Sequence, residues 1–244
     1  MSIDLDTDIQ TEPKNILLAS SGKGVSNLST VSVLRTRGMI PARTVQVWGS
    51  LFTPLNHKYA SLIESEKEAD EALNHAVETI LADMQAMNFK YVLFMDDDNI
   101  PPQDGLLTLL KTIGEYDGIS GLYVTKDPAH WPLMLGDPKD LKDWTPQGYR
   151  EGVHECNGMG MGFVLLKLEI FKAMPKPWFK IVNSPEGNIR RMNEDVYFYY
   201  HARQAGYRFA VNANCRVGHL SSDMKQIFYP PEAKKKEPTN GKAS

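Results

Sequence analysis

The stretch YVLFMDDDNIPP, residues 91–102, has three consecutive aspartates directly after five apolar or aromatic residues. A near-continuous apolar run such as Tyr91–Met95 is typical of a strand that is buried on both faces of a parallel sheet. Carboxylates this close together repel one another, and each is costly to remove from water. Three acids at the end of a buried strand therefore need a physical reason.

Ligand binding at the end of this strand would supply that reason. In open α/β sheets the binding crevice lies beyond the carboxyl ends of the strands. A divalent cation there removes the repulsion between ionised carboxylates, and oxygen donors suit Mg²⁺ or Mn²⁺. The alternative is a solvated acidic turn that caps the next helix. Because alternate side chains of an extended segment share a face, we expect Asp96 and Asp98 to converge while Asp97 points apart.

The composition of the whole chain is that of an ordinary globular protein. Its 244 residues are 42% hydrophobic and 23% charged, with a net charge of −3. This charge gives no global attraction to nucleic acid or to anionic membranes. Two cysteines outside any CxxC pair give no support to a zinc ribbon or a redox motif. The acidic start lacks the pattern of a signal peptide and no apolar run reaches the roughly 20 residues of a membrane span, so we expect a cytoplasmic protein.

The pattern of apolar residues predicts strands and helices that alternate within a single domain. We expect strands at 15–20, 44–48, 91–95, 118–124 and 208–212. We expect helices after the loop at 20–24, between residues 60 and 87, at 104–113 and at 194–205. Alternation of this kind predicts an α/β fold whose mixed, mainly parallel sheet is flanked by helices. The more irregular second half predicts some antiparallel pairing there.

Three later segments, together with the aspartate stretch, resemble a known enzyme family. They are GMGMGFVLLKLEIF (158–171), NEDVYFYYHARQAGYRFAVN (193–212) and VGHL (217–220). In this order the four segments resemble the DxD region, the glycine-rich acceptor-side segment, the Glu-Asp helix and the late metal-binding histidine of GT-A-fold, family 2-like nucleotide-sugar glycosyltransferases. The resemblance covers most of residues 14–220 and implies a Rossmann-like GT-A sheet.

The composition of the two ends, together with the resemblance, indicates how we expect the chain to be divided. A disordered leader at 1–13 precedes a GT-A-like domain at 14–229, and a flexible basic tail follows at 230–244. Within the domain, residues 14–125 would form the nucleotide-binding half and residues 126–229 the acceptor half.

A metal site follows from the resemblance as well. Asp98, Asp96 and His219 would hold Mn²⁺ or Mg²⁺, and Asp96 and Asp97 would also contact the nucleotide sugar. Carboxylate and imidazole together suit Mn²⁺. A lone histidine is equally compatible with a structural role, so both interpretations of His219 stay open.

Two acids at the start of the predicted helix at 194–205 are the candidate catalytic residues. The resemblance implies that Asp195, or alternatively Glu194, is the general base or a sugar-contacting acid. Acids in the first turn of a helix also interact favourably with the helix dipole, which is the structural alternative.

The remaining candidates for nucleotide-sugar binding are Ser20, Ser21, Asn74 and Gly160. The loop SSGKG (20–24) lacks the GxxxxGK[ST] spacing of a phosphate-binding P-loop, so that reading is rejected. Asn74 follows Leu73 where many relatives have an Arg-Asn pair. Gly160 permits close approach of a ligand to the backbone, and a bulged strand entry is the alternative.

These implications predict a metal-dependent glycosyltransferase with a UDP-sugar as the favoured donor. The acceptor hydroxyl could belong to a glycan, a protein, a small molecule or a hydroxymethylated base in viral DNA, in which case the protein would act in the host cytoplasm. Two alternatives from other classes stay open: a nucleotidyl or phosphoryl transferase, which also uses clustered acids and Mg²⁺, and a non-catalytic module that binds nucleotide sugars.

Overall fold

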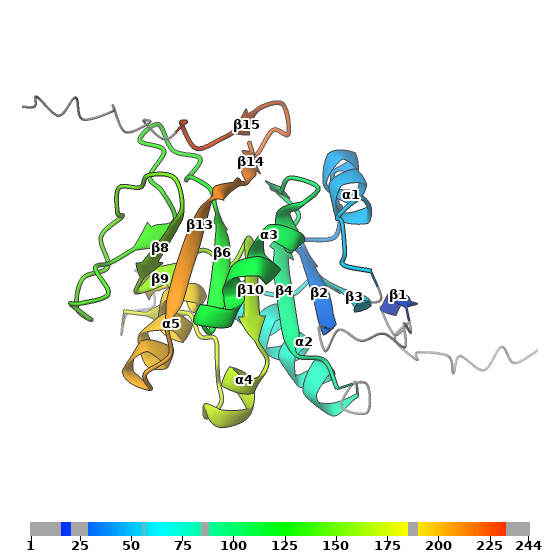
Figure 1. Ribbon diagram of the computed structural model, residues 1–244, viewed down its shortest axis with the longest axis horizontal. Helices are drawn as coiled ribbons and strands as arrows, with labels where there is room; N and C mark the ends of the chain where they lie inside the picture. The colour runs from blue at the N-terminus through cyan, green and yellow to red at the C-terminus, as the bar shows by residue number, and fades with distance from the viewer. Residues whose placement is uncertain (1–15, 21–28, 56, 84–87, 185–189, 233–244) are drawn as a thin grey trace, which may run out of the picture.

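The computed structural model describes residues 16–20, 29–55, 57–83, 88–184 and 190–232 (Figure 1). The strands of its main sheet are β1 (Ile16–Ser20), β2 (Ser29–Thr36), β3 (Lys58–Ser65), β4 (Tyr91–Asp96), β6 (Gly118–Leu122), β8 (Val153–Cys156), β10 (Phe163–Lys167) and β13 (Phe209–Arg216). The short strands are β5 (Asn99–Ile100), β7 (Met134–Leu135), β9 (Gly158–Met159), β11 (Val182–Asn183), β12 (Arg190–Met192), β14 (Gly218–Leu220) and β15 (Ile227–Phe228). The helices are α1 (Ala42–Gly49), α2 (Ala69–Ala82), α3 (Gly105–Thr112), the 3-10 helix η2 (Ile113–Glu115), α4 (Glu169–Ala173) and α5 (Glu194–Gln204).

The main sheet is mixed, with the strand order β1-β3-β2-β4-β10-β6-β13-β8. Three neighbouring pairs are parallel, namely β3 with β2, β2 with β4, and β6 with β13. The other four are antiparallel, and three of these involve β8 or β10 from the second half of the chain. The mixed α/β fold and the antiparallel pairing expected after residue 125 are therefore confirmed. The expectation of a mainly parallel sheet is wrong, because antiparallel pairs outnumber parallel ones.

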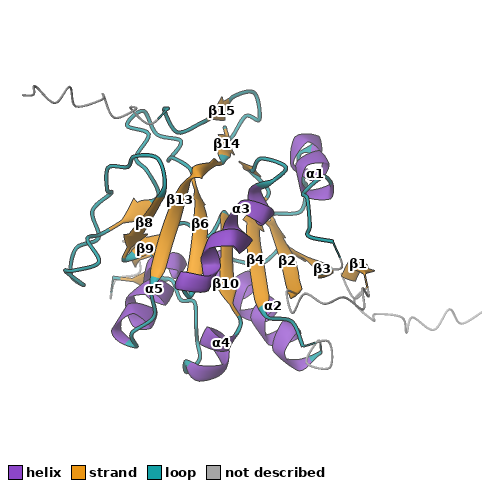
Figure 2. Cartoon of the chain, viewed as in Figure 1, coloured by secondary structure: helices purple, strands orange, loops and turns teal. Residues whose placement is uncertain are grey.

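Helices cover both faces of this sheet because its central strands are apolar on both sides. In β4, Val92 and Phe94 belong to one core cluster, to which α2, α4 and α5 contribute. Leu93 and Met95 point the other way and join the cluster that α3 completes, and α3 lies in front of the strands in Figure 2. Each large apolar side chain buried in this way stabilises the fold by about 1.5–3 kcal/mol. The interpretation of Tyr91–Met95 as a strand buried on two faces is confirmed.

The strand expected at 44–48 is wrong, because these residues lie in α1. Thr44 and Trp48 are four residues apart and so share one face of a helix. On that face the Thr44 hydroxyl donates to the backbone oxygen of Asp97 at 2.5 Å, and the Trp48 indole donates to the Ser32 hydroxyl at 3.1 Å. Tertiary contacts of the helical face therefore outweigh the β propensity of TVQVW.

Two strands replace helical structure that the sequence led us to expect. The helix predicted between residues 60 and 87 begins only at Ala69, because residues 58–65 form β3 with Ala60, Leu62 and Glu64 buried on one face. The helix expected after the loop at 20–24 falls partly on residues 21–28, outside the described residues. From Ser29 onward the chain forms β2 instead.

The order of the strands marks one position in the sheet for ligand binding. From β2 the chain passes through α1 to β3, on one side of β2, and then through α2 to β4 on the other side. The direction of winding thus reverses between β2 and β4. In open α/β sheets a crevice forms at the carboxyl ends of the two strands that flank such a reversal.

Candidate functional site

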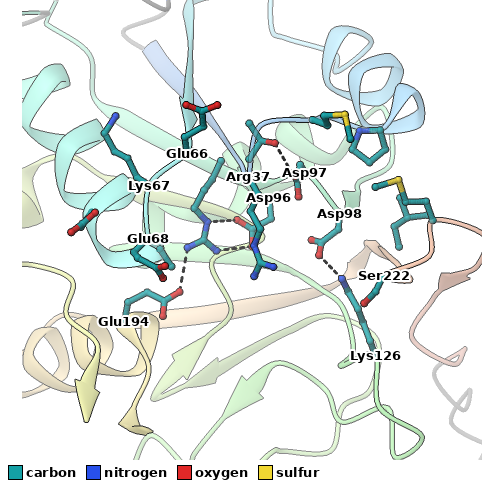
Figure 3. Close-up of a pocket in the computed structure, with 18 of the residues that line it drawn as sticks. Arg37, Glu66, Lys67, Glu68, Asp96, Asp97, Asp98, Lys126, Glu194 and Ser222 are labelled. Atoms are coloured by element: carbon teal, nitrogen blue, oxygen red, sulfur yellow. Dashed lines mark hydrogen bonds and ion pairs between the residues drawn. The ribbon is translucent and has the colours of Figure 1, made fainter. Parts of the chain in front are cut away.

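A cleft of about 1090 Å³ lies at the carboxyl ends of β2 and β4 (Figure 3). Its position matches the reversal in strand order. Polar side chains from six parts of the chain line it, among them Arg35, Thr36, Asp96, Asp97, Asp98, Lys126 and Glu194. The structure therefore brings the three aspartates of the opening stretch together with Glu194, which lies about 100 residues later in the sequence.

Arg35, near the end of β2, connects two of the predicted acids. Its Nε and Nη2 donate to the two carboxylate oxygens of Asp96 at 2.8 and 2.9 Å, and its Nη1 donates to Glu194 at 3.2 Å. Burial would lower the pKa of Arg35, but these two acids outweigh burial and raise it above its usual value. The guanidinium thus joins β2, β4 and α5. Sequence reasoning missed Arg35, although it ends the β-branched run STVSVLR at 29–35.

Asp97 holds the turn after β4 in place. Its Oδ2 accepts a hydrogen bond from the Thr36 hydroxyl at 2.7 Å, and its backbone N–H donates to the Arg35 oxygen at 3.0 Å. Burial raises the pKa of Asp97, and the neighbouring aspartates add to this effect. These contacts give Asp97 a structural role, and a role in donor binding stays a prediction.

The three aspartates do not alternate as an extended strand would arrange them. Strand β4 ends at Asp96, and Asp97 and Asp98 form a turn before β5. Asp96 points to Arg35 and Asp97 points to Thr36. Asp98 points to Lys126 (Figure 3). The expected convergence of Asp96 and Asp98 assumed a strand that continues through Asp98, and it is wrong for that reason.

Asp98 lies between two basic side chains. Lys126 donates to its Oδ2, and the Nε2 of His219 lies 3.7 Å from its Oδ1, longer than a hydrogen bond. Burial on its own would raise the pKa of Asp98, but His219 and Lys126 outweigh it and the pKa falls to about 2. The carboxylate is therefore ionised at any physiological pH.

The orientation of His219 leaves its Nε2 facing Asp98. Its Nδ1 is 2.7 Å from the backbone oxygen of Val124, which can only accept, so Nδ1 carries the proton of the neutral ring. Nε2 is the ring nitrogen that faces the Asp98 oxygen, and in the neutral ring it is free to bind a cation. A carboxylate oxygen and an imidazole nitrogen arranged in this way suit a shared cation such as Mn²⁺.

The number of side chains that could act as ligands limits how the predicted metal could be held. Among the described residues, no group of three or more His, Cys, Asp or Glu side chains is placed to hold a metal ion. Both oxygens of Asp96 already accept from Arg35, which leaves Asp98 and His219 as the fitting pair. Two protein ligands suffice where substrate phosphates and water complete the coordination, as is usual for Mg²⁺ with nucleotides.

Asp195 lies beside Glu194 in the first turn of α5. Its Oδ1 accepts from the backbone N–H of Val196 at 2.7 Å. Burial raises the pKa of Asp195 to about 6, and the negative charge of Glu194 adds to this effect. Asp195 is therefore a stronger base than an ordinary aspartate.

The other sequence candidates that the structure describes do not line the cleft. Ser20 ends the edge strand β1, where its backbone lies opposite Tyr59 of β3, and Ser21 lies outside the described residues. Gly160 is buried, and a Cβ on it would lie 2.0 Å from the hydroxyl of Tyr123. This contact explains the glycine by close packing, and its predicted role in binding remains untested.

Asn74 makes four hydrogen bonds, three of which fasten the segment 178–179 to α2. Its Nδ2 donates to the backbone oxygens of Asp70 and Phe179, both at 2.8 Å, and its Oδ1 accepts from the N–H groups of Trp178 and Phe179. We expect Asn74→Ala to lower the free energy of unfolding by about 2 kcal/mol, because it leaves these backbone groups without partners. Urea denaturation measures this change, and an unaltered midpoint would argue against the structural role.

One comparison with solved structures agrees with the fold. The chain resembles the crystal structure of A197 from STIV with a TM-score of 0.59 and 20% identity, covering 86% of this chain and 98% of that one. It also matches the crystal structure of GalNAc-T7 with UDP, GalNAc and Mn²⁺, with a TM-score of 0.46 and 13% identity, covering 80% of this chain and 44% of that one.

The first similarity shows a shared fold. The TM-score of the second is too low to support a conclusion. No protein-family model matches the sequence, and no curated protein matches it. Among the described helices, none is both long enough and apolar enough to span a membrane.

Proposed function

We propose that this chain is a metal-dependent glycosyltransferase that binds a nucleotide-diphosphate sugar, with a UDP-sugar favoured, in the cleft between β2 and β4. The observation that carries the proposal is the Asp98–His219 pair, whose carboxylate oxygen and Nε2 face each other at 3.7 Å. This pair lies at the carboxyl end of a central strand, where α/β proteins bind nucleotides. The resemblance of the four sequence segments to GT-A enzymes supports the same conclusion.

Asp98 and His219 would hold the divalent cation, which when bound neutralises the charge that grows on the leaving nucleoside diphosphate. Arg35 keeps Asp96 and Glu194 in fixed positions beside this pair. In this proposal Asp96 therefore shapes the donor site through Arg35.

Asp195 is the proposed general base. With a pKa of about 6 it is mostly ionised at neutral pH, and it is more basic than a solvated aspartate. A base of this kind can accept the proton of an attacking acceptor hydroxyl. Glu194 is held by Arg35, which makes it the weaker candidate.

A donor-hydrolysis assay over UDP- and GDP-sugars, with and without Mn²⁺, tests the proposal. We expect Mn²⁺-dependent release of the nucleoside diphosphate, and a decrease of about 100-fold in Asp98→Asn. Asp117→Asn is the matched control, since Asp117 also pairs with a lysine but lies beside Lys167 at the other end of β10.

Other outcomes of this assay would favour the alternatives. Binding of nucleotide sugars without turnover would indicate a non-catalytic module, and release of pyrophosphate from a nucleoside triphosphate would indicate nucleotidyl transfer. Activity that needs no metal, or that Asp98→Asn leaves unchanged, would contradict the proposed site. An acceptor screen over glycans, proteins, small molecules and DNA with hydroxymethylated bases would then define the second substrate.

A further inference from the structure

Lys126 occupies the place beside Asp98 where a cation would act. Its ammonium group contacts Oδ2 of Asp98, while His219 faces Oδ1 of the same carboxylate. The side chains of Lys126 and Asp98 are 27% and 31% exposed, so the pair lies at the wall of the cleft, where solutes can reach it. The lysine follows β6 and comes from a different part of the chain than Asp98.

The Lys126 ammonium would repel a divalent cation bound to the same Asp98 carboxylate. Like charges a few ångströms apart repel each other strongly in a partly buried site. The lysine side chain is long and flexible, with a charge on its end only, so it can move away at small cost. Displacement would leave its charge inside the cleft. Among the other basic residues of the cleft, Arg35 pairs with Asp96 and Glu194, and Lys67 pairs with Glu64. Arg37 lines the cleft as well.

We infer that Lys126 is a built-in counter-cation of Asp98, which a divalent cation displaces and which then binds the diphosphate of the incoming nucleotide. The inference rests on the proposed function, because it assumes that Asp98 and His219 hold the cation. Lys126 thus competes with the metal and assists the nucleotide. The two effects have opposite signs, which makes them separable from a simple loss of folding.

Titration of the full-length protein with Mn²⁺ alone, followed by electron paramagnetic resonance, tests the first effect. We expect Lys126→Met to bind Mn²⁺ about tenfold more tightly than the unaltered chain, because a charge-assisted hydrogen bond no longer opposes the cation. The matched control is Lys167→Met, which breaks an ion pair whose side chains are both 27% exposed, at the end of β4 remote from Asp96. The control should leave Mn²⁺ affinity unchanged.

Calorimetric titration with UDP at saturating Mn²⁺ tests the second effect. Here we expect Lys126→Met to bind UDP about tenfold more weakly, because a phosphate loses one charged donor. Unchanged or weaker Mn²⁺ binding in Lys126→Met would overturn the competition, and unchanged UDP binding would overturn the transfer to the diphosphate.

The same titrations separate this inference from the proposed function. If the unaltered chain binds Mn²⁺, Asp98→Asn abolishes the binding and Lys126→Met does not alter it, the cation site stands and the role of Lys126 is wrong. If Mn²⁺ binds to neither the unaltered chain nor Lys126→Met, the proposed cation site and the inference are both wrong.

Discussion

Arg35→Met is expected to lower the free energy of unfolding by about 3–5 kcal/mol, the range observed when one partner of a buried ion pair is removed. The guanidinium is the shared partner of Asp96 and Glu194, and the side chains of all three residues are at most 24% exposed. Without Arg35, two carboxylates would remain close together in a poorly solvated site. Urea denaturation at neutral pH measures the change.

Two further variants make this result specific. Arg208→Met breaks an ion pair with Glu155 in which the arginine is 52% exposed, and we expect little change in stability. Combining Arg35→Met with Asp96→Asn should recover part of the lost stability, since one uncompensated charge is gone. A loss below about 1 kcal/mol in Arg35→Met would contradict the central position of this arginine in the site.

Asp195→Asn is expected to lower the rate of sugar transfer by about 10²–10⁴-fold, the usual contribution of a general base. UDP binding should be nearly unchanged, because the proposal gives Asp195 a role at the acceptor hydroxyl and none at the diphosphate. A comparison of turnover with UDP affinity in the same variant separates the two. An activity within a factor of about three of the unaltered chain would remove Asp195 from the catalytic role.

The same substitution has a predicted effect on stability that depends on pH. The pKa of Asp195 in the folded chain is about 6, above the ordinary value of 3.8, so the folded state binds this proton more tightly than the unfolded state. Its contribution to stability is therefore greatest below pH 4 and decreases as the pH rises through 6, by about 3 kcal/mol in all. Asp195→Asn should lack this dependence and be at least as stable as the unaltered chain at pH 8. If the free energy of unfolding changed with pH in the same way in Asp195→Asn and in the unaltered chain, the burial of this carboxylate would be contradicted.

The parts of the fold that the sequence predicts well are those with a strong local pattern. The run at 91–95 is apolar at every position, and both sides of β4 are indeed covered by helices. The amphipathic pattern at 69–82 and the glycine at 206, which has a φ of +91°, likewise mark α2 and the end of α5. The failures at 44–48 and 58–65 have one cause: short segments of mixed propensity take the structure that their tertiary contacts select.

The site was only partly predictable for a related reason. The acids at 96–98 and at 194–195 stand out in the sequence because carboxylates are clustered there. Arg35 and Lys126 are single basic residues, and nothing local distinguishes them from solvated surface residues. Only the strand order, which puts the end of β2 beside β4 and the segment after β6 beside Asp98, reveals that both are partners of the acidic cluster.

The most direct test of the account is a crystal of the protein with Mn²⁺ and UDP, examined by anomalous diffraction at the manganese absorption edge. We predict one anomalous peak within coordination distance of both the Asp98 carboxylate and His219 Nε2, with the UDP diphosphate on its other side and Lys126 moved away from Asp98. A manganese peak elsewhere, or bound UDP with no manganese beside Asp98 and His219, would contradict the account.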